Sequence, residues 1–171
     1  MKQLLVFAIL SLVMYSCSGN KNKAETSNKD QTSYELDKLL AVADQEVDKT
    51  LTVVGYVTHT CVHSGQRCFI TGESQEASIR VEAGGEISGF DMKLIGSKLA
   101  VTGVLKENRL SQEYIAGMEK DVQLMKEGGE SVEACEAELS NISDMRKWMR
   151  DHDKDYYVIY YMDGLNYETL D

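Results

Sequence analysis

The chain has 171 residues, 18 basic and 28 acidic side chains, and a formal net charge of −10 at neutral pH. This acidic balance opposes binding to nucleic-acid phosphates, because that affinity comes from lysine and arginine displacing counterions. Most of the chain has the length of one ordinary domain, long enough to bury a core.

The first 17 residues are predicted to be an export signal. Lys2 supplies the positive start, and the apolar run from Leu4 to Met14 is too short to span a bilayer as a permanent helix. The run ends at Ser16-Cys17, which resembles a bacterial lipoprotein signal. The resemblance implies a lipid anchor on Cys17. We expect an outer-membrane lipoprotein of the bacterial cell envelope that faces the periplasm, although the signal itself leaves the membrane and the leaflet open. An ordinary secretory peptide, with Cys17 incidental, is the alternative.

Residues 18–33 are expected to form a disordered tether. They carry no large apolar side chain and are rich in Asn, Lys, Ser and Thr. Such a segment cannot bury enough surface to offset the entropy lost on ordering. Without residues 1–17 the chain keeps 17 basic and 28 acidic residues, a formal charge of −11.

The folded part, residues 34–128, begins with a predicted helix and continues with strands. Thr32 and Glu35 have capping-box spacing, and apolar residues follow at helical intervals to about Asp48. From Leu51 the apolar period changes to two, in four runs with β-branched residues: LTVVGYVTHTCVH, RCFITG, ASIRVEA and KLAVTGVLKE. Gly55 and Gly103 lie inside these strand patterns, which favours bulges or sharp bends in a curved sheet. The pattern predicts a mainly β fold, a small antiparallel barrel with flanking helices.

Two further helices are predicted, one after Arg109 that ends at Gly128-Gly129, and one from about Ser131 to Arg150. Cys135 lies on the apolar stripe of the second helix and is expected to be a buried thiol. Residues 129–171 are therefore a helical and tyrosine-rich C-terminal extension, whose last segment is expected to form a short strand or a tail packed on the domain.

The strand order resembles the OB-fold domains of small exported bacterial lipoproteins of unknown function. The resemblance covers about residues 34–120 and implies a fold and an envelope location. It brings no activity, because the OB barrel carries many unrelated functions. The matching residues are Val53, Gly55 and Val57; His59, Cys61, His63, Gly65, Arg67, Cys68 and Phe69; Ile79, Val81 and Glu82; Phe90; and 101–105.

The segment VTHTCVHSGQRCF, residues 57–69, is the candidate site. If Ser64-Gly65 is a two-residue turn, Cys61 faces Cys68 across the hairpin. Alternation then places His59 and His63 on the face that carries both sulfurs. A slip of one residue would separate the two cysteines, so the site depends on the register of the hairpin.

Three chemistries fit this predicted patch. Cys61, His63 and Cys68 supply three ligands for zinc or copper, with His59 or water as the fourth. A disulfide between Cys61 and Cys68 is the structural alternative, since an exported protein meets an oxidising compartment. A redox-active cysteine pair is the third, and the chain offers no Cys-x-x-Cys motif to support it.

We therefore expect a lipid-anchored envelope protein that binds rather than transforms. The sharper hypothesis is metal binding at the hairpin, and a disulfide-stapled interaction module for an envelope protein partner is the competitor. Nucleic-acid binding is disfavoured by the charge and by the expected lack of interleaved aromatic and basic residues on a strand face.

Overall fold

A computed structural model describes residues 32–170 of the chain. The predicted signal, Cys17 and nearly all of the predicted tether lie outside these residues. Within 32–170, no helix combines the length and the apolar character needed to cross a membrane.

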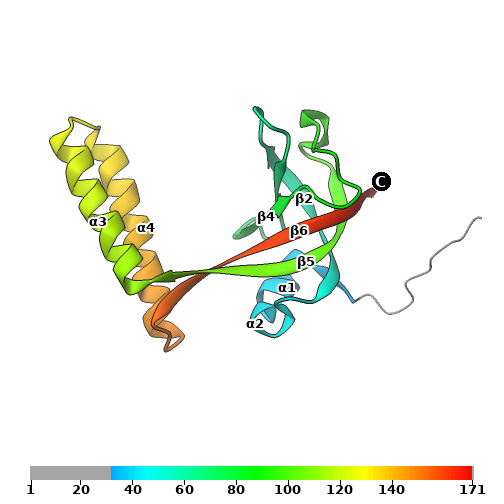
Figure 1. The fold of residues 1–171 in the computed structure, drawn as a ribbon, viewed down its shortest axis with the longest axis horizontal. Helices are drawn as coiled ribbons and strands as arrows, with labels where there is room; N and C mark the ends of the chain where they lie inside the picture. The colour runs from blue at the N-terminus through cyan, green and yellow to red at the C-terminus, as the bar shows by residue number, and fades with distance from the viewer. Residues whose placement is uncertain (1–31, 171) are drawn as a thin grey trace, which may run out of the picture.

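The described chain forms a barrel and a helical arm (Figure 1). The first half contains β1 (Ser33–Glu35), α1 (Leu36–Leu40), α2 (Ala43–Glu46), β2 (Thr50–Thr60), β3 (Arg67–Thr71) and β4 (Ser78–Glu82). The second half contains the 3-10 helix η1 (Met92–Leu94), β5 (Lys98–Ser111), α3 (Gln112–Glu127), α4 (Val132–Asp151) and β6 (Tyr156–Leu170).

Five of the strands close into an OB-like barrel, which confirms the fold predicted from the sequence. The sheet runs β1-β2-β3-β4-β6-β5, and β2 pairs with β5 to close the ring. All barrel pairs are antiparallel except β4 with β6, which is parallel. β1 adds a short parallel strand outside β2, so the predicted first helix is replaced by this strand and two shorter helices.

The C-terminal segment is a structural strand of the barrel and extends further than expected. β6 pairs with β5 along its whole length and with β4 at Tyr161–Asp163. It therefore supplies one wall of the barrel core, in which Met162 is fully buried. The predicted extension 129–171 thus divides into α4, which packs on α3, and β6, which closes the barrel.

Two glycines allow the barrel to close tightly. A Cβ at Gly55 would lie 2.7 Å from the carbonyl oxygen of Thr71. A Cβ at Gly103 would lie 2.5 Å from the carbonyl oxygen of Asp163, where the β5–β6 register shifts. The register shift confirms the bulge predicted at Gly103. At Gly55 the requirement is close approach of two strands, and the ladder with β5 is regular there.

The arm consists of α3 and α4, and it has its own hydrophobic core. Ser111 and Ser131 cap the two helices by accepting hydrogen bonds from Tyr114 N (3.1 Å) and Ala134 N (3.1 Å). The buried residues of this core are Leu110, Ile115, Val122, Cys135, Ile142 and Met149. None of them belongs to the buried core of the barrel. The prediction that Cys135 is a buried thiol is confirmed.

The arm projects from the barrel on a two-stranded ribbon. The ribbon comprises Glu107–Ser111 of β5 and Tyr156–Tyr160 of β6, which pair with each other and lie outside the β2–β5 and β4–β6 ladders. Figure 1 shows the arm rising from this ribbon at an angle to the barrel, so that the described chain forms a V. We call the concave surface inside the V the notch.

Candidate functional site

The predicted hairpin register is wrong by one residue. Thr60, and not Cys61, faces Cys68, and His59 faces Phe69. The cause is a bulge between Val57 and His59, which inserts one extra residue into β2 and places Thr58 and His59 together on the outside. After a bulge the alternation of the strand restarts with the opposite phase. The chain then turns through a longer loop, closed by a hydrogen bond from Gly65 N to Cys61 O (2.8 Å).

The two cysteines consequently lie in different environments. Cys68 is fully buried in the barrel core, and burial raises the pKa of its thiol to about 12. Cys61 lies at the start of the turn, partly exposed, with its backbone N–H bonded to Arg67 O (2.8 Å). Cys61, Cys68 and Cys135 are all free thiols in the structure. The geometry expected for a cross-strand disulfide between Cys61 and Cys68 is not formed.

The predicted metal ligands are not gathered either. His59 points outward and packs on Phe69, with ring centroids 5.9 Å apart. His63 is exposed in the turn, and the Cys68 thiol faces the opposite side of the sheet, into the core. Among residues 32–170 there is no group of three or more His, Cys, Asp or Glu side chains placed to hold a metal ion. A chelate that uses Cys68 would require the barrel to open.

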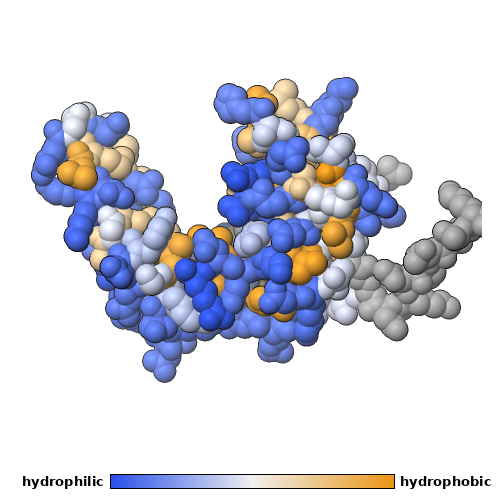
Figure 2. Space-filling model, in the orientation of Figure 1, coloured by the Kyte–Doolittle hydropathy of each residue, from blue (hydrophilic) through white to orange (hydrophobic). Residues whose placement is uncertain are grey.

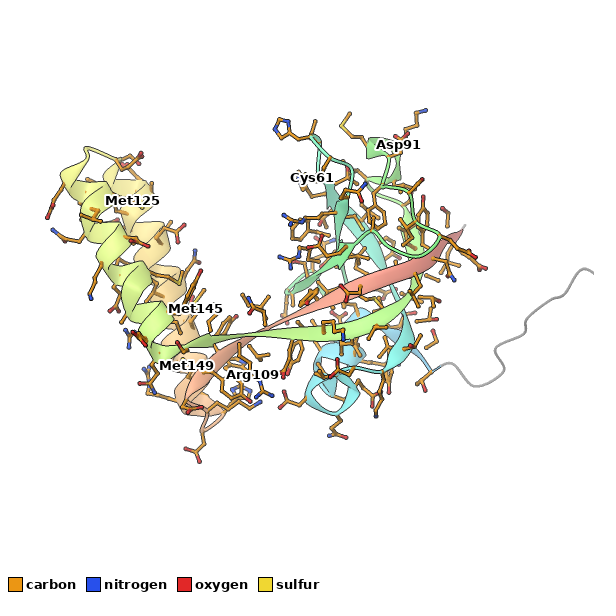
Figure 3. All side chains as sticks on the ribbon, in the orientation of Figure 1. Cys61, Asp91, Arg109, Met125, Met145 and Met149 are labelled. Carbon is orange, nitrogen blue, oxygen red and sulfur yellow. The ribbon has the colours of Figure 1, made fainter. Side chains whose placement is uncertain are left out.

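Cys61 has an environment that favours its thiolate. Ser64 Oγ donates a hydrogen bond to Cys61 Sγ (3.3 Å), and the backbone amides of Ser64 and His63 also donate to it. These donors, with a smaller contribution from the Arg67 charge, lower the pKa of the Cys61 thiol below its usual value. A partly exposed thiol with a lowered pKa is the more reactive kind. Figure 3 shows Cys61 at the rim of the barrel, on the side of the arm.

The outer face of the barrel carries a row of aromatic and basic side chains that sequence reasoning missed. The row runs across four neighbouring strands, because the register places its members directly beside one another: His59 of β2, Phe69 of β3, Arg80 of β4 and Tyr161 of β6. Its two pairs are the His59–Phe69 contact and the Arg80 guanidinium, which lies 5.1 Å from the centre of the Tyr161 ring. The expectation that no strand face interleaves aromatic and basic residues was wrong.

Acidic side chains balance the positive charge of this row. Glu82 forms ion pairs with Arg67 (3.0 Å) and with Arg80 (2.8 Å), and Asp163 is its neighbour on β6. Arg80 Nε lies 2.8 Å from Glu82 Oε1, so the buried part of this guanidinium is paired with a neighbouring carboxylate.

The notch adds a second wall and a floor to this surface. Figure 2 shows it as a wide hollow between the arm and the barrel, with hydrophobic patches near its base. At the base, a hollow of about 280 Å³ lies between Leu40 of α1, Trp148 of α4 and residues 157–160 of the ribbon. A second hollow of about 210 Å³ shares Leu40, Trp148 and Tyr160 with it.

A polar clamp holds the base of the arm against the barrel. Lys154 Nζ forms an ion pair with Asp44 Oδ2 of α2 (2.7 Å), and the Tyr160 hydroxyl donates to the other oxygen of Asp44. The bonds from Lys154 and Tyr160 lower the pKa of Asp44, and burial together with the Asp44 charge raises the pKa of Tyr160. Trp148 stacks on His152 with centroids 4.2 Å apart and lies edge-on to Tyr157. The angle of the V is therefore fixed by specific contacts.

The chain matches no family model and none of the curated proteins with which it was compared. The site therefore has to be interpreted from its own geometry. Phe69 and Arg80 lie in strands that the sequence predicted, at outward positions of those strands. Tyr161 comes from the segment that was expected to form a short strand or a tail, so the row as a whole depended on a strand pairing that periodicity alone does not provide.

Proposed function

We propose that this protein is a binding module of the bacterial envelope that holds a protein partner in the notch. The observation that carries the proposal is the row His59–Phe69–Arg80–Tyr161, which lies on the outer face of the barrel and is bordered by the arm. OB barrels bind their ligands on the face of their second and third strands, between the loops that join strands 1 to 2 and 4 to 5. In this barrel those strands are β3 and β4, and those loops are the Cys61 turn and the arm.

The charge of the surface supports a protein partner over a nucleic acid. Interleaved aromatic and basic side chains also occur on single-strand binding surfaces, where a positive groove follows the backbone. Here Glu82 pairs with both Arg67 and Arg80, and the whole chain carries a net charge of −10. Aromatic residues and arginine are the side chains enriched at protein interfaces. Tight binding of a single-stranded oligonucleotide at physiological salt would contradict this choice.

The proposed location of the module is inferred from the predicted export signal at residues 1–17. Cys17 and the predicted tether would let the folded part reach partners at the membrane surface, as the resemblance to lipoprotein signals implies. Metabolic labelling with a radioactive fatty acid tests this part separately. Label is expected on the chain and should be absent from a Cys17→Ala variant, whereas label in both, or in neither, would contradict the anchor.

Photocrosslinking in cells tests the binding function. A photoreactive phenylalanine derivative placed at Tyr161 is expected to give a discrete adduct with an envelope protein. Placed at Tyr114, which is exposed on α3 outside the row, it should give none. A double variant, Phe69→Ala with a photoreactive group at Tyr161, should lose most of the adduct. Equal adducts at both positions, or none at Tyr161, would contradict the proposal.

A thiol function of Cys61 is the second candidate, and the hydrogen bonds to its sulfur favour it. Cys68 and Cys135 are buried in separate cores, so neither stands ready to resolve a disulfide on Cys61. This candidate is therefore a single reactive thiolate that attacks a disulfide of a partner protein, forms a mixed disulfide with one of its sulfur atoms and releases the other as a thiolate. Non-reducing electrophoresis of envelope extracts should show an adduct that a Cys61→Ser variant lacks.

A further inference from the structure

The two parts of β6 have different neighbours. Residues Tyr161–Asp163 lie between β5 on one side and β4 on the other. Residues Tyr156–Tyr160 pair with β5 on one side, but they form no ladder pair with β4, because that ladder begins at Arg80–Tyr161. Within residues 32–170, this part of the ribbon therefore presents one strand edge without a partner strand. The first residues of β4, Ser78 and Ile79, lie next to the upper end of this edge, and Ala77 and Ser78 line the same hollow as residues 157–160.

An open strand edge exposes backbone donors and acceptors that a further strand can satisfy. Proteins usually protect such edges with charges, prolines, bulges or a covering element, because otherwise other chains pair with them. Neither proline nor a charged residue occurs in Tyr156–Tyr160, and the β5–β6 register is regular there. The sequence of this segment, YYVIY, is instead rich in the aromatic and β-branched residues that favour strands.

The hollow of about 280 Å³ lies along this edge. Its lining includes four consecutive residues, 157–160. Successive side chains of a strand point to opposite faces of the sheet. Contact with four successive residues is the lining expected of a hollow that runs along a strand edge. Ala77 and Ser78 line the end of the hollow, so it occupies the space into which β4 would continue.

The walls of the hollow suit an apolar side chain. Leu40 from the barrel and Trp148 from the arm both line it, and both are half-buried. Trp148 is held in place by its stacking on His152 and its edge contact with Tyr157. Ile159 is 38% exposed, although it is a large apolar residue. An added strand would cover these groups and pair with the free edge at the same time.

We propose that an extended segment of a partner protein adds as a strand beside Tyr156–Tyr160, in the prolongation of β4, and places an apolar side chain between Leu40 and Trp148. In this mode the main chain gives affinity and the side-chain pocket gives selectivity. The inference rests on the proposed function, since it names the kind of partner and how it enters the notch. The arm then has a defined role, because it supplies one wall of the strand-binding hollow.

Selection from a phage-displayed library of random twelve-residue peptides tests the proposal, with the full-length chain in detergent as the target. The enriched peptides are expected to slow hydrogen exchange at Tyr156–Tyr160. A lysine on an edge opposes strand addition, so Ile159→Lys should weaken their binding at least tenfold. Leu124→Lys is the matched control, because Leu124 is 63% exposed on α3, and it should change the affinity less than twofold.

Three outcomes would overturn the strand-addition proposal. Peptides that protect other segments, peptides insensitive to Ile159→Lys, or a library without binders would each do so. A dimer of the full-length chain that Ile159→Lys dissociates would instead identify a second copy as the occupant and would also contradict the proposal. If the crosslink at Tyr161 forms while the peptides fail, only the strand-addition inference is lost. If both fail, the binding function fails with it.

Discussion

The core of the arm gives a quantitative prediction. Ile142 of α4 is 2% exposed and packs in the centre of the arm core, which shares no buried residue with the barrel core. Replacing Ile142 by alanine removes buried methyl and methylene groups and leaves a cavity. Substitutions of this kind cost about 2 to 5 kcal/mol, and we expect about 2 to 4 kcal/mol here. The loss should fall on the arm alone.

The arm is small enough for this loss to open it locally. Two helices of 16 and 20 residues fall below the ~40 residues at which a fold usually needs extra support. A tenfold change in an equilibrium corresponds to about 1.4 kcal/mol, so hydrogen exchange of the buried arm amides should accelerate by about 30- to 1000-fold. Exchange in β2 and β3 should change less than about twofold.

Hydrogen exchange measured by mass spectrometry, segment by segment, checks this prediction. Leu124→Ala is the control, because Leu124 is exposed on α3 and its removal should cost less than about 0.5 kcal/mol. If Ile142→Ala accelerates exchange in the arm and the barrel by the same factor, the two parts unfold as one cooperative unit. The reasoning from separate cores would then be refuted.

Three further predictions follow from the geometry. Gly103→Ala should lower the free energy of unfolding, measured in urea, by about 1 to 3 kcal/mol, because the new Cβ would clash with the backbone of β6 at Asp163. Gly117→Ala is the control on α3: it has open space around it and should raise the free energy of unfolding by about 0.5 to 1 kcal/mol. Iodoacetamide should alkylate Cys61 long before Cys68, with a pH midpoint below that of an ordinary cysteine, and Ser64→Ala should raise this midpoint; equal rates for the two cysteines would contradict the assignment. The folded state holds the pKa of Asp44 below its ordinary 3.8, so the clamp stabilises the fold above that pH and its contribution is lost as the pH falls through the lowered pKa. The urea midpoints of the wild type and of Asp44→Asn should therefore converge in acid. A difference between the midpoints that stays constant with pH would exclude the effect.

Local patterns in the sequence were enough to predict most of the elements. The period-two runs correspond to β2, β3, β4 and β5, and the two helical stripes correspond to α3 and α4. These features depend on residues close together in the chain. The last segment was also recognised as β-prone, but its place beside β4 and β5 depends on contacts made across the whole fold, which periodicity does not contain.

The candidate site was harder to predict, because a shift of one residue in the register of the β2–β3 hairpin decides which side chains face one another. Perfect alternation from Val57 to His63 would have placed Cys61 opposite Cys68. The bulge at Thr58 shifts the register of β2 by one residue, so that Thr60, and not Cys61, faces Cys68 with its side chain buried. Neither threonine nor histidine marks a bulge as a glycine does, so the sequence carried no local signal of the slip. The same register shift places His59 beside Phe69, so that His59 is the first residue of the row and not a ligand of the predicted metal site.

The arm joins the barrel at a single point of the β5–β6 ladder. The chain leaves β5 at Ser111 and returns to β6 at Tyr156, and these two residues are partners in the ladder. Everything between them is an insertion whose entry and exit lie side by side. A tight turn in its place would leave every barrel strand intact, and a different insert would leave the row of the barrel unchanged. Such a junction would allow the segment between Ser111 and Tyr156 to be replaced without a break in any barrel strand, at the cost of the Lys154–Asp44 contact.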